Sequence, residues 1–176
     1  GRRPPDLRSF PPSIPTYGDF ANPMQGTSTG DNARYVRWSW QVSADETDYR
    51  PVSKGGGHCK WRGLNRSVVR WGQSGEMYRT LPGAALRNAE RMASTALVFS
   101  DTGMLGLNVR VLLPGQVFIA SGPGIEVRVG HPLAHLSFLN SRVATILLRT
   151  LTPKLTTSAG YIRRLPCPEA IIHDPS

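Results

Sequence analysis

Short hydrophobic patterns of period two run through the middle of this 176-residue sequence, and one long helical pattern follows near its end. Apolar residues alternate with polar ones in 36–42 and again in 107–113, as in strands with one buried face. Residues 66–71 and 125–129 are interpreted as further short strands. A regular alternation of strand and helix, which would build a doubly wound sheet, is not seen. The sequence therefore predicts an α+β domain with a twisted mixed or antiparallel sheet covered by at least two helices.

The alternating patterns also predict how strands pair and which aromatic residues are buried. Residues 107–113 lead into a Pro-Gly turn and then directly into 117–120, an arrangement typical of a hairpin. In the earlier pattern, Trp38 and Trp40 occupy the apolar positions. We therefore expect both tryptophans in the core rather than on the surface.

Two segments have helical patterns. Ala84–Ser94 contains good helix formers with apolar residues spaced for one face. His131–Leu151 is the clearer helix, because Pro132 suits a first turn and Thr152-Pro153 would end it. Its apolar stripe predicts that it packs against the rest of the fold. The stripe consists of Leu136, Leu139, Val143, Ile146 and Leu147.

The chain is long enough for one domain with a substantial core, since 39% of its residues are hydrophobic. Residues 1–33 are rich in Pro, Gly and Ser and have no hydrophobic period, so we expect an irregular arm and loop there. Residues 34–176 are expected to form a single α+β domain. The early prolines are also typical of a linker at which a longer polypeptide was cut.

The segment Lys54–Trp71 combines three consecutive glycines with five cations and contains no carboxylate. Like charges at this density repel one another, so they require either full solvation or a partner that supplies negative charge. Trp61 and Trp71 favour a partner, because large aromatic residues bring burial or stacking energy. The five cations are Lys54, Lys60, Arg62, Arg66 and Arg70.

Positive charge is concentrated around this segment. The chain carries 21 Lys and Arg residues against 12 Asp and Glu, a net charge of +9. Nine of the cations lie between Arg50 and Arg91, where only Glu76 and Glu90 are acidic. Only three residues are lysines, and the guanidinium groups that make up the rest bind phosphates and the guanine edge bidentately. The composition favours a nucleic acid as the partner, although genomic base composition also produces Arg-rich surfaces.

Several classes of protein fit the sequence poorly. The two cysteines are too few for a disulfide framework, and no apolar run reaches the length of a membrane span, so we expect a cytoplasmic protein without a membrane partner. The first fifteen residues contain basic residues but no apolar core after them, unlike a secretory signal.

Metal and catalytic motifs are also lacking. His131 and His135 have a helical spacing but no adjacent Glu, and the His58-Cys59 pair has no second pair at ligand spacing, so no metal is expected. Gly122–Gly124 lacks the Lys-Ser/Thr of a phosphate loop, and no nucleophile-elbow motif frames a serine. We therefore expect no catalysis by this chain.

Three stretches carry motifs in a fixed order. Gln25–Val42 contains Gln-Gly, then Thr-Gly-Asp-Asn, an Arg and an aromatic-rich strand. Lys54–Trp71 contains Lys-Gly-Gly, Lys-Trp, Asn and Val-Val-Arg-Trp. Phe138–Pro168 contains Leu-Asn-Ser-Arg-Val, a Pro, a Thr-rich turn, Gly-Tyr-Ile and Leu-Pro. Together they resemble the target recognition (specificity) half of BREX or phage-growth-limitation-type adenine-specific DNA methyltransferases and related restriction-modification fusions. The chain departs from this pattern at Leu97-Val98, where the family usually has Trp-Ser.

The resemblance implies a target recognition domain with the fold of a specificity subunit, cut from a larger enzyme. The family's Asn/Asp-Pro-Pro-aromatic loop, which holds the flipped adenine, and its glycine-rich loop for S-adenosylmethionine have no match in this sequence. The resemblance therefore implies that S-adenosylmethionine binds a catalytic domain of the same parent chain, upstream of Gly1, and that this part has no cofactor of its own.

The candidate DNA contacts form three groups. Polar side chains that hydrogen-bond to base edges come first: Gln25, Thr27, Thr29, Asp31, Asn32 and Arg34. The basic segment offers phosphate and groove contacts, with glycines that let the backbone approach closely: Lys54, Gly55, Gly56, Gly57, Lys60, Arg62, Asn65, Arg66 and Arg70. A third group would contact phosphates from the other side of the duplex: Lys154, Thr156 and Thr157. Each group also has a structural interpretation: a capping turn, a flexible surface loop and a helix-terminating turn, respectively.

From these residues and this resemblance we expect a sequence-specific double-stranded DNA recognition domain of a larger methyltransferase in restriction-modification or anti-phage defence. Its partners would be duplex DNA and the catalytic domain of the same parent chain, with other defence-system subunits as further candidates. The alternative is a docking module whose basic face binds an acidic partner subunit or a DNA mimic. A nuclease ranks last, because the sequence has no Asp/Glu-x-Lys cluster.

Overall fold

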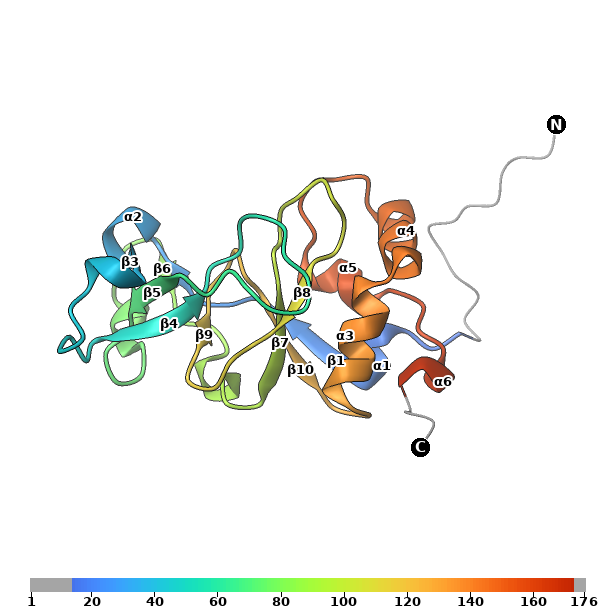
Figure 1. Ribbon diagram of the computed structural model, residues 1–176, viewed down its shortest axis with the longest axis horizontal. Helices are drawn as coiled ribbons and strands as arrows, with labels where there is room; N and C mark the ends of the chain where they lie inside the picture. The colour runs from blue at the N-terminus through green and yellow to red at the C-terminus, as the bar shows by residue number, and fades with distance from the viewer. Residues whose placement is uncertain (1–13, 173–176) are drawn as a thin grey trace.

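The computed structural model describes residues 14–172 and has an α+β fold, as the sequence predicts (Figure 1). Two four-stranded sheets lie side by side along the long axis of the molecule, and most of the helices pack around one of them. We call the part with these helices the helical lobe and the other part the sheet lobe. A two-stranded ribbon in the sheet lobe pairs β2 (Ser28–Thr29) with β6 (Ala84–Ala85).

The sheet of the helical lobe has the strand order β1-β10-β7-β8, and all of its adjacent strands pair antiparallel. Its strands are β1 (Ala21–Met24), β7 (Thr95–Phe99), β8 (Val109–Val111) and β10 (Gly124–Val127). The surrounding helices are α1 (Tyr17–Phe20), α3 (Pro132–Asn140), α4 (Arg142–Leu151), α5 (Ala159–Arg163) and α6 (Glu169–Ile172). Leu97, Phe99 and Ile125 of the sheet share one buried core with Leu139 and Leu148 of the helices.

The sheet lobe has the strand order β3-β5-β4-β9, in which β4 and β9 are parallel and the other pairs antiparallel. Its strands are β3 (Val36–Trp38), β4 (Tyr49–Ser53), β5 (Ser67–Arg70) and β9 (Val117–Phe118). One short helix, α2 (Asn32–Tyr35), and three 3-10 turns complete it: η1 (Ser39–Gln41), η2 (Glu76–Arg79) and η3 (Ala89–Arg91). The predicted strands at 66–71 and 125–129 are confirmed as β5 and β10.

The predicted hairpin of residues 107–113 with 117–120 is wrong. Strand β8 lies at the edge of the helical lobe's sheet, whereas Val117 and Phe118 of β9 pair in parallel with Val52 and Ser53 of β4 in the sheet lobe. The turn between the two strands therefore carries the chain from one sheet to the other. Long-range pairing with β4 overrides the local turn signal.

The irregular arm was predicted for residues 1–33. Within residues 14–33 this prediction is wrong, because they include α1, β1 and β2. Residues 1–13 lie outside the described residues. Strand β1 is an edge strand of the helical lobe's sheet. After it, the chain crosses to the sheet lobe at Gly26, where a Cβ would lie 2.6 Å from the Phe118 carbonyl oxygen. Only glycine allows this close backbone approach.

The predicted helix at Ala84–Ser94 is also wrong. Residues 84–85 form β6, and only the single turn η3 follows. Asn88 between them has a φ of 52°, the left-handed conformation that ends regular helix. Pairing of β6 with β2, together with packing of Ala89 and Met92 on the core, decides the structure here.

The predicted helix His131–Leu151 forms as two helices. It begins with Pro132 in its first turn and ends at Leu151 as predicted, but Ser141 has extended backbone (φ −70°, ψ 158°) and separates α3 from α4. The side chain of Ser141 accepts a hydrogen bond from the Ala144 N–H and so caps α4. This break interrupts the predicted stripe: Leu136 and Leu139 are buried, Leu147 is half-buried, and Val143 and Ile146 are exposed.

The prediction that Trp38 and Trp40 belong to the core is wrong, since their exposed fractions are 47% and 67%. Strand β3 ends at Trp38, and the chain turns through η1 instead of continuing to Val42. The period-two pattern of residues 36–42 therefore corresponds to a strand over only its first three residues. The two indoles stack on each other at the surface of the sheet lobe.

Candidate nucleic-acid interface

Three hollows in the surface collect many of the predicted contact residues. The Trp38 hollow, of about 300 Å³, is lined by Ala33, Val36, Arg37, Trp38, Gln41, Lys54 and Ser67. The Asn32 hollow, also about 300 Å³, is lined by Gln25, Thr27, Ser28, Thr29, Gly30, Asn32, Gly83, Asp101, Ile119, Ala120 and Ser121. The Thr156 hollow, about 290 Å³, is lined by Gln25, Asp101, Ala120, Pro123 and residues 156–160.

The three hollows are neighbours. Gln25, Asp101 and Ala120 line both the Asn32 hollow and the Thr156 hollow, so these two share a wall. Ser121 of the Asn32 hollow donates a hydrogen bond through its hydroxyl to the carbonyl of Lys54, which lines the Trp38 hollow. The structure thus brings together residues from all three sequence groups.

Within the first group, some side chains face the solvent and others hold the fold. Gln25, Asn32 and Arg34 are exposed, and the Arg34 guanidinium lies over the Tyr35 ring, 5.4 Å from its centroid. Thr27, by contrast, is completely buried, and its hydroxyl bonds to the backbone of Arg87. Thr27 is thus buried although it lines the Asn32 hollow, and its predicted contact with a base stays a prediction.

Two more residues of this group serve the local backbone. Thr29 is 4% exposed and donates its hydroxyl hydrogen to Oδ1 of Asn32 at 2.7 Å. Asp31 caps α2 by accepting a hydrogen bond from the Arg34 N–H at 3.0 Å. The capping interpretation of Asp31 is confirmed. Thr29 is buried and orients the Asn32 amide, and its own predicted contact with DNA stays a prediction.

The three glycines of the basic segment have left-handed backbone, with φ values of 74°, 77° and 86° for Gly55, Gly56 and Gly57. A Cβ on Gly55 would overlap the Ser121 carbonyl oxygen, so Gly55 supports packing between the loop and residues 121–122. Gly56 has open space around it, and among residues 14–172 its N–H has no protein acceptor. The backbone of Gly56 is therefore free to meet a phosphate.

The cations of the basic segment differ in their surroundings. Arg62 and Arg66 are exposed and Lys54 is half-buried, and no carboxylate among residues 14–172 pairs with any of them. Arg70 is exposed and pairs with Asp48 at 3.5 Å, a contact that solvent weakens. The charges therefore remain available to an anionic partner at four of the five predicted positions.

Lys60 is the fifth cation, and its role is structural. Its ammonium donates a hydrogen bond to the carbonyl of Asn140 at 2.7 Å, which ties the basic segment to the end of α3. Asn65, also a predicted contact, is exposed and accepts a hydrogen bond from the Gln116 amide through Oδ1 at 3.2 Å. Its NH₂ group stays available to a ligand.

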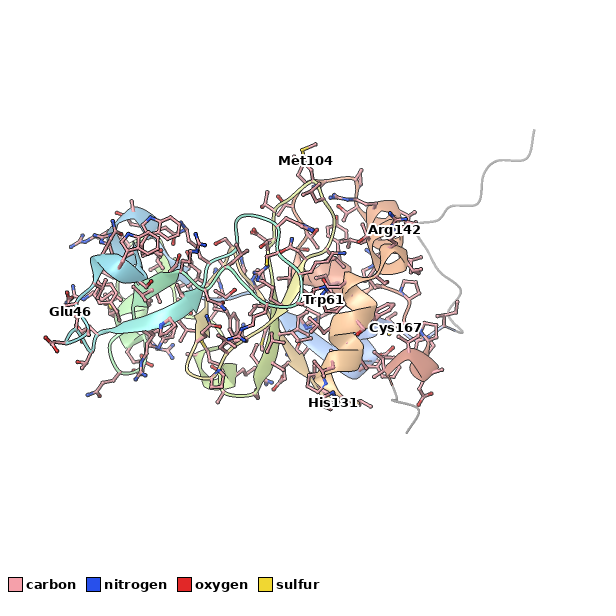
Figure 2. All side chains as sticks on the ribbon, in the orientation of Figure 1. Glu46, Trp61, Met104, His131, Arg142 and Cys167 are labelled. Atoms are coloured by element: carbon pink, nitrogen blue, oxygen red, sulfur yellow. The ribbon has the colours of Figure 1, made fainter. Side chains whose placement is uncertain are left out.

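The basic segment is anchored along the edge of β8. Trp61 donates its N–H to the Val109 carbonyl at 2.9 Å and accepts from the Val111 N–H at 3.0 Å, so it adds a short parallel pairing to this edge strand (Figure 2). Asn140 completes the edge, because its side chain accepts from the Val109 N–H at 2.8 Å and donates to the Val109 carbonyl at 2.9 Å. The Leu-Asn-Ser motif therefore has a structural role.

A buried arginine lies beneath this loop. Arg110 of β8 is 1% exposed, and its Nη1 donates to the carbonyl of Cys59 and to the side chains of Ser100 and Asn108. Burial lowers the pKa of this guanidinium, although it stays protonated at neutral pH. Among residues 14–172 no carboxylate lies within ion-pair distance of it. Its charge therefore adds to the positive potential of the loop above.

The third group lies beside the Thr156 hollow. Lys154 and Thr156 are exposed, and Lys154 belongs to the turn after α4, where Arg149 donates to its carbonyl. Thr157 is 7% exposed and donates its N–H to the Asp101 carbonyl. Thr157 is thus buried although it lines the hollow, whereas Lys154 and Thr156 are accessible, and its predicted phosphate contact stays a prediction.

Asp101 is the site residue that sequence reasoning missed. It lines both shared hollows, and its carboxylate accepts a hydrogen bond from the Thr102 hydroxyl at 3.1 Å. Partial burial raises the pKa of this carboxyl above its usual value. A carboxylate at such a position can accept a hydrogen bond from the amino group of cytosine. A lone Asp beyond the apolar residues of β7 gives no sequence signal of this kind.

The described histidine and cysteine residues, within 14–172, are not grouped as a metal centre. His135 is buried, with Nε2 2.7 Å from the Val129 carbonyl and Nδ1 3.0 Å from the Tyr17 hydroxyl. Since a carbonyl only accepts, Nε2 carries the proton and Nδ1 accepts from Tyr17. Among residues 14–172, no three His, Cys, Asp or Glu side chains are grouped to hold a metal ion. Within the same residues every helix falls short of the length and apolar character of a membrane span.

Comparison with known proteins adds no family to these observations. Neither a protein-family model nor a curated protein sequence matches this chain.

Proposed function

We propose that this chain is a sequence-specific double-stranded DNA recognition domain with no catalysis of its own. The motifs described above extend the proposal to a parent chain, an adenine-specific DNA methyltransferase whose catalytic domain binds S-adenosylmethionine. In such an enzyme one domain must hold the duplex while another accepts the adenine turned out of the base stack.

The observation that supports this proposal is the meeting of two kinds of side chain. Gln25, Asn32 and Asp101 line adjoining hollows, and their amide and carboxylate groups pair with the major-groove edges of adenine and cytosine. The basic segment begins beside them, because Lys54 is hydrogen-bonded through its carbonyl to Ser121 of the same hollow. Side chains of the kinds that hydrogen-bond to base edges therefore lie next to Lys54, a candidate phosphate contact.

Exposure and charge indicate which residues would supply affinity and which would supply specificity. Arg62 and Arg66 have no ion-pair partner among residues 14–172, so their neutralisation by phosphates releases counterions and supplies affinity that does not depend on sequence. Thr29 donates a hydrogen bond to Oδ1 of Asn32, so the NH₂ group of Asn32 remains for an acceptor on a base. Specificity would come from such fixed amides, since positioned donors reject bases that present the wrong pattern.

The salt dependence of duplex binding tests the phosphate contacts. The double variant Arg62→Ala, Arg66→Ala should bind a random duplex more weakly. The negative slope of log K against log [salt] should become shallower by roughly 2. The matched control is Arg128→Ala, Arg142→Ala, which removes two exposed charges from the helical lobe, and Figure 2 labels Arg142. Binding is followed by fluorescence anisotropy between about 50 and 200 mM salt.

An unchanged slope in the Arg62/Arg66 variant, or an equal loss in the control, would show that the basic segment does not hold the duplex. Base reading is tested separately by selecting bound sequences from a random duplex pool. The wild-type chain should enrich one motif, and Asn32→Ala should relax it at one position. Sequencing the methylated sites of cells that carry the parent enzyme would give the same motif.

A further inference from the structure

The stacked pair of Trp38 and Trp40 is not used by the function proposed above. Their ring centroids are 5.1 Å apart with an interplanar angle of 3°, and both rings remain largely exposed. Tryptophan surface left in water is costly, and exposed tryptophans are enriched where proteins bind a partner. The pair is therefore a candidate contact surface.

The backbone that carries this pair is held rigidly. Strand β3 pairs with β5, and the Ser39 N–H donates to the Arg66 carbonyl at 2.8 Å just after the strand ends. The Trp38 N–H donates to Oε1 of Gln41 at 2.9 Å, which closes the turn η1 on itself. A ligand that stacks on these rings meets a surface already formed, so little ordering entropy is lost.

The Trp38 hollow beside the pair supplies the rest of a nucleotide site. Its volume is about 300 Å³, and Trp38, Gln41 and Lys54 are among the residues that line it. Among residues 14–172 the NH₂ group of Gln41 has no hydrogen-bond acceptor, and its oxygen accepts from the Trp38 N–H within the turn. An aromatic face, an amide donor and an unpaired ammonium together suit a base and its phosphate.

We propose that the Trp38 hollow binds an unpaired nucleobase of the DNA, which stacks on Trp38, the member of the stacked pair that lines the hollow, while Lys54 contacts its phosphate. This inference rests on the proposed function and adds a second kind of DNA contact to it. Stacking tolerates any base, because every base has a π-face, so this contact would be independent of the recognised sequence. Positive charge around the hollow favours DNA over an apolar protein surface as the occupant.

The test compares two labelled DNAs that differ by one extrahelical adenine in an otherwise identical duplex. The full 176-residue chain should bind the bulged duplex about tenfold more tightly, in line with one stacked base. Trp38→Leu and Trp40→Leu should each remove most of this preference, whereas the Phe variants at the same positions should retain it. Affinity for the fully paired duplex should change by less than about twofold in all four.

Met104→Ala is the control, because Met104 is 79% exposed on the helical lobe, away from β3 (Figure 2). The Leu and Phe variants separate stacking from apolar docking, since leucine keeps an apolar surface and lacks a π-face. An equal affinity of the wild-type chain for the two DNAs overturns the inference and leaves the proposed function intact. A wild-type chain that binds neither DNA overturns both. Equal losses on both DNAs in the Leu variants also contradict stacking on an unpaired base.

Discussion

Asn140 holds the edge of β8 through two hydrogen bonds to one residue, and its removal should destabilise the whole chain. Asn140 is 5% exposed, and Val109, which it contacts, is fully buried. In Asn140→Ala the Val109 N–H loses its side-chain acceptor, whereas the Val109 carbonyl keeps the Trp61 N–H as a donor. The two lost bonds are therefore unequal in cost.

An orphaned buried donor costs about 1–3 kcal/mol, and a lost hydrogen bond whose acceptor stays satisfied costs about 1 kcal/mol. Asn140→Ala should therefore lower the free energy of unfolding by about 3 kcal/mol. For a chain of this size that corresponds to a melting temperature lower by about 6–12 °C. Urea denaturation followed by circular dichroism measures the change, with an unaltered m-value as the sign of an unaltered denatured state.

Two further variants distinguish hydrogen bonding from packing. Asn140→Asp keeps the shape and the acceptor for the Val109 N–H, but it places a carboxylate oxygen against the Val109 carbonyl and buries a charge, so it should be at least as destabilising as alanine. Ser137→Ala lies on the same helix at an exposed position and should change stability by less than about 0.5 kcal/mol. A loss below about 1 kcal/mol in Asn140→Ala would refute the assigned role of this side chain.

Three other predictions concern single residues. Burial lowers the pKa of His135, so its neutral form contributes stability that is present above about pH 6.5 and is lost as the pH falls through the native pKa. The free energy of unfolding, measured from about pH 7.5 downward, should therefore fall less steeply with pH in His135→Gln than in the wild-type chain. An unchanged slope would contradict this. Partial burial raises the pKa of Asp101, so its charged form destabilises the chain at pH 7. Asp101→Asn should therefore raise the free energy of unfolding at pH 7, and this gain should shrink as the pH approaches about 4. A lower free energy of unfolding at pH 7 would contradict this. Gly55→Ala should destabilise more than Gly56→Ala in thermal unfolding, because both have positive φ but only Gly55 packs against a backbone carbonyl, and equal effects would refute this packing.

Sequence patterns predicted several elements correctly where the interactions are local. The α+β class, strands β5 and β10, the proline start of α3 and the end of α4 at Leu151 all follow from periodicity and capping residues. The exposed positions of Arg62 and Arg66 also agree with an unpaired basic segment. In each case the signal and the structure involve residues that are close in the chain.

Other elements depended on contacts that sequence periodicity does not record. Strand β9 pairs with β4 across more than sixty residues of chain instead of closing a hairpin with β8. Trp38 and Trp40 are exposed because β3 ends early, and Thr27 is buried where it bridges Ile119 between β1 and β2. Local propensity is weak beside such long-range pairing.

The amino-acid sequence by itself determined the chemistry of this protein: its positive charge, the guanidinium groups that carry it, the glycines that permit a tight loop, and the class of fold. Only the tertiary structure decided which groups meet. It placed Asp101 beside Gln25, tied Lys60 to α3, and left two stacked indoles facing the solvent. The physical reason is that side-chain type is a property of one residue, whereas burial and proximity depend on the packing of segments that are distant in the chain.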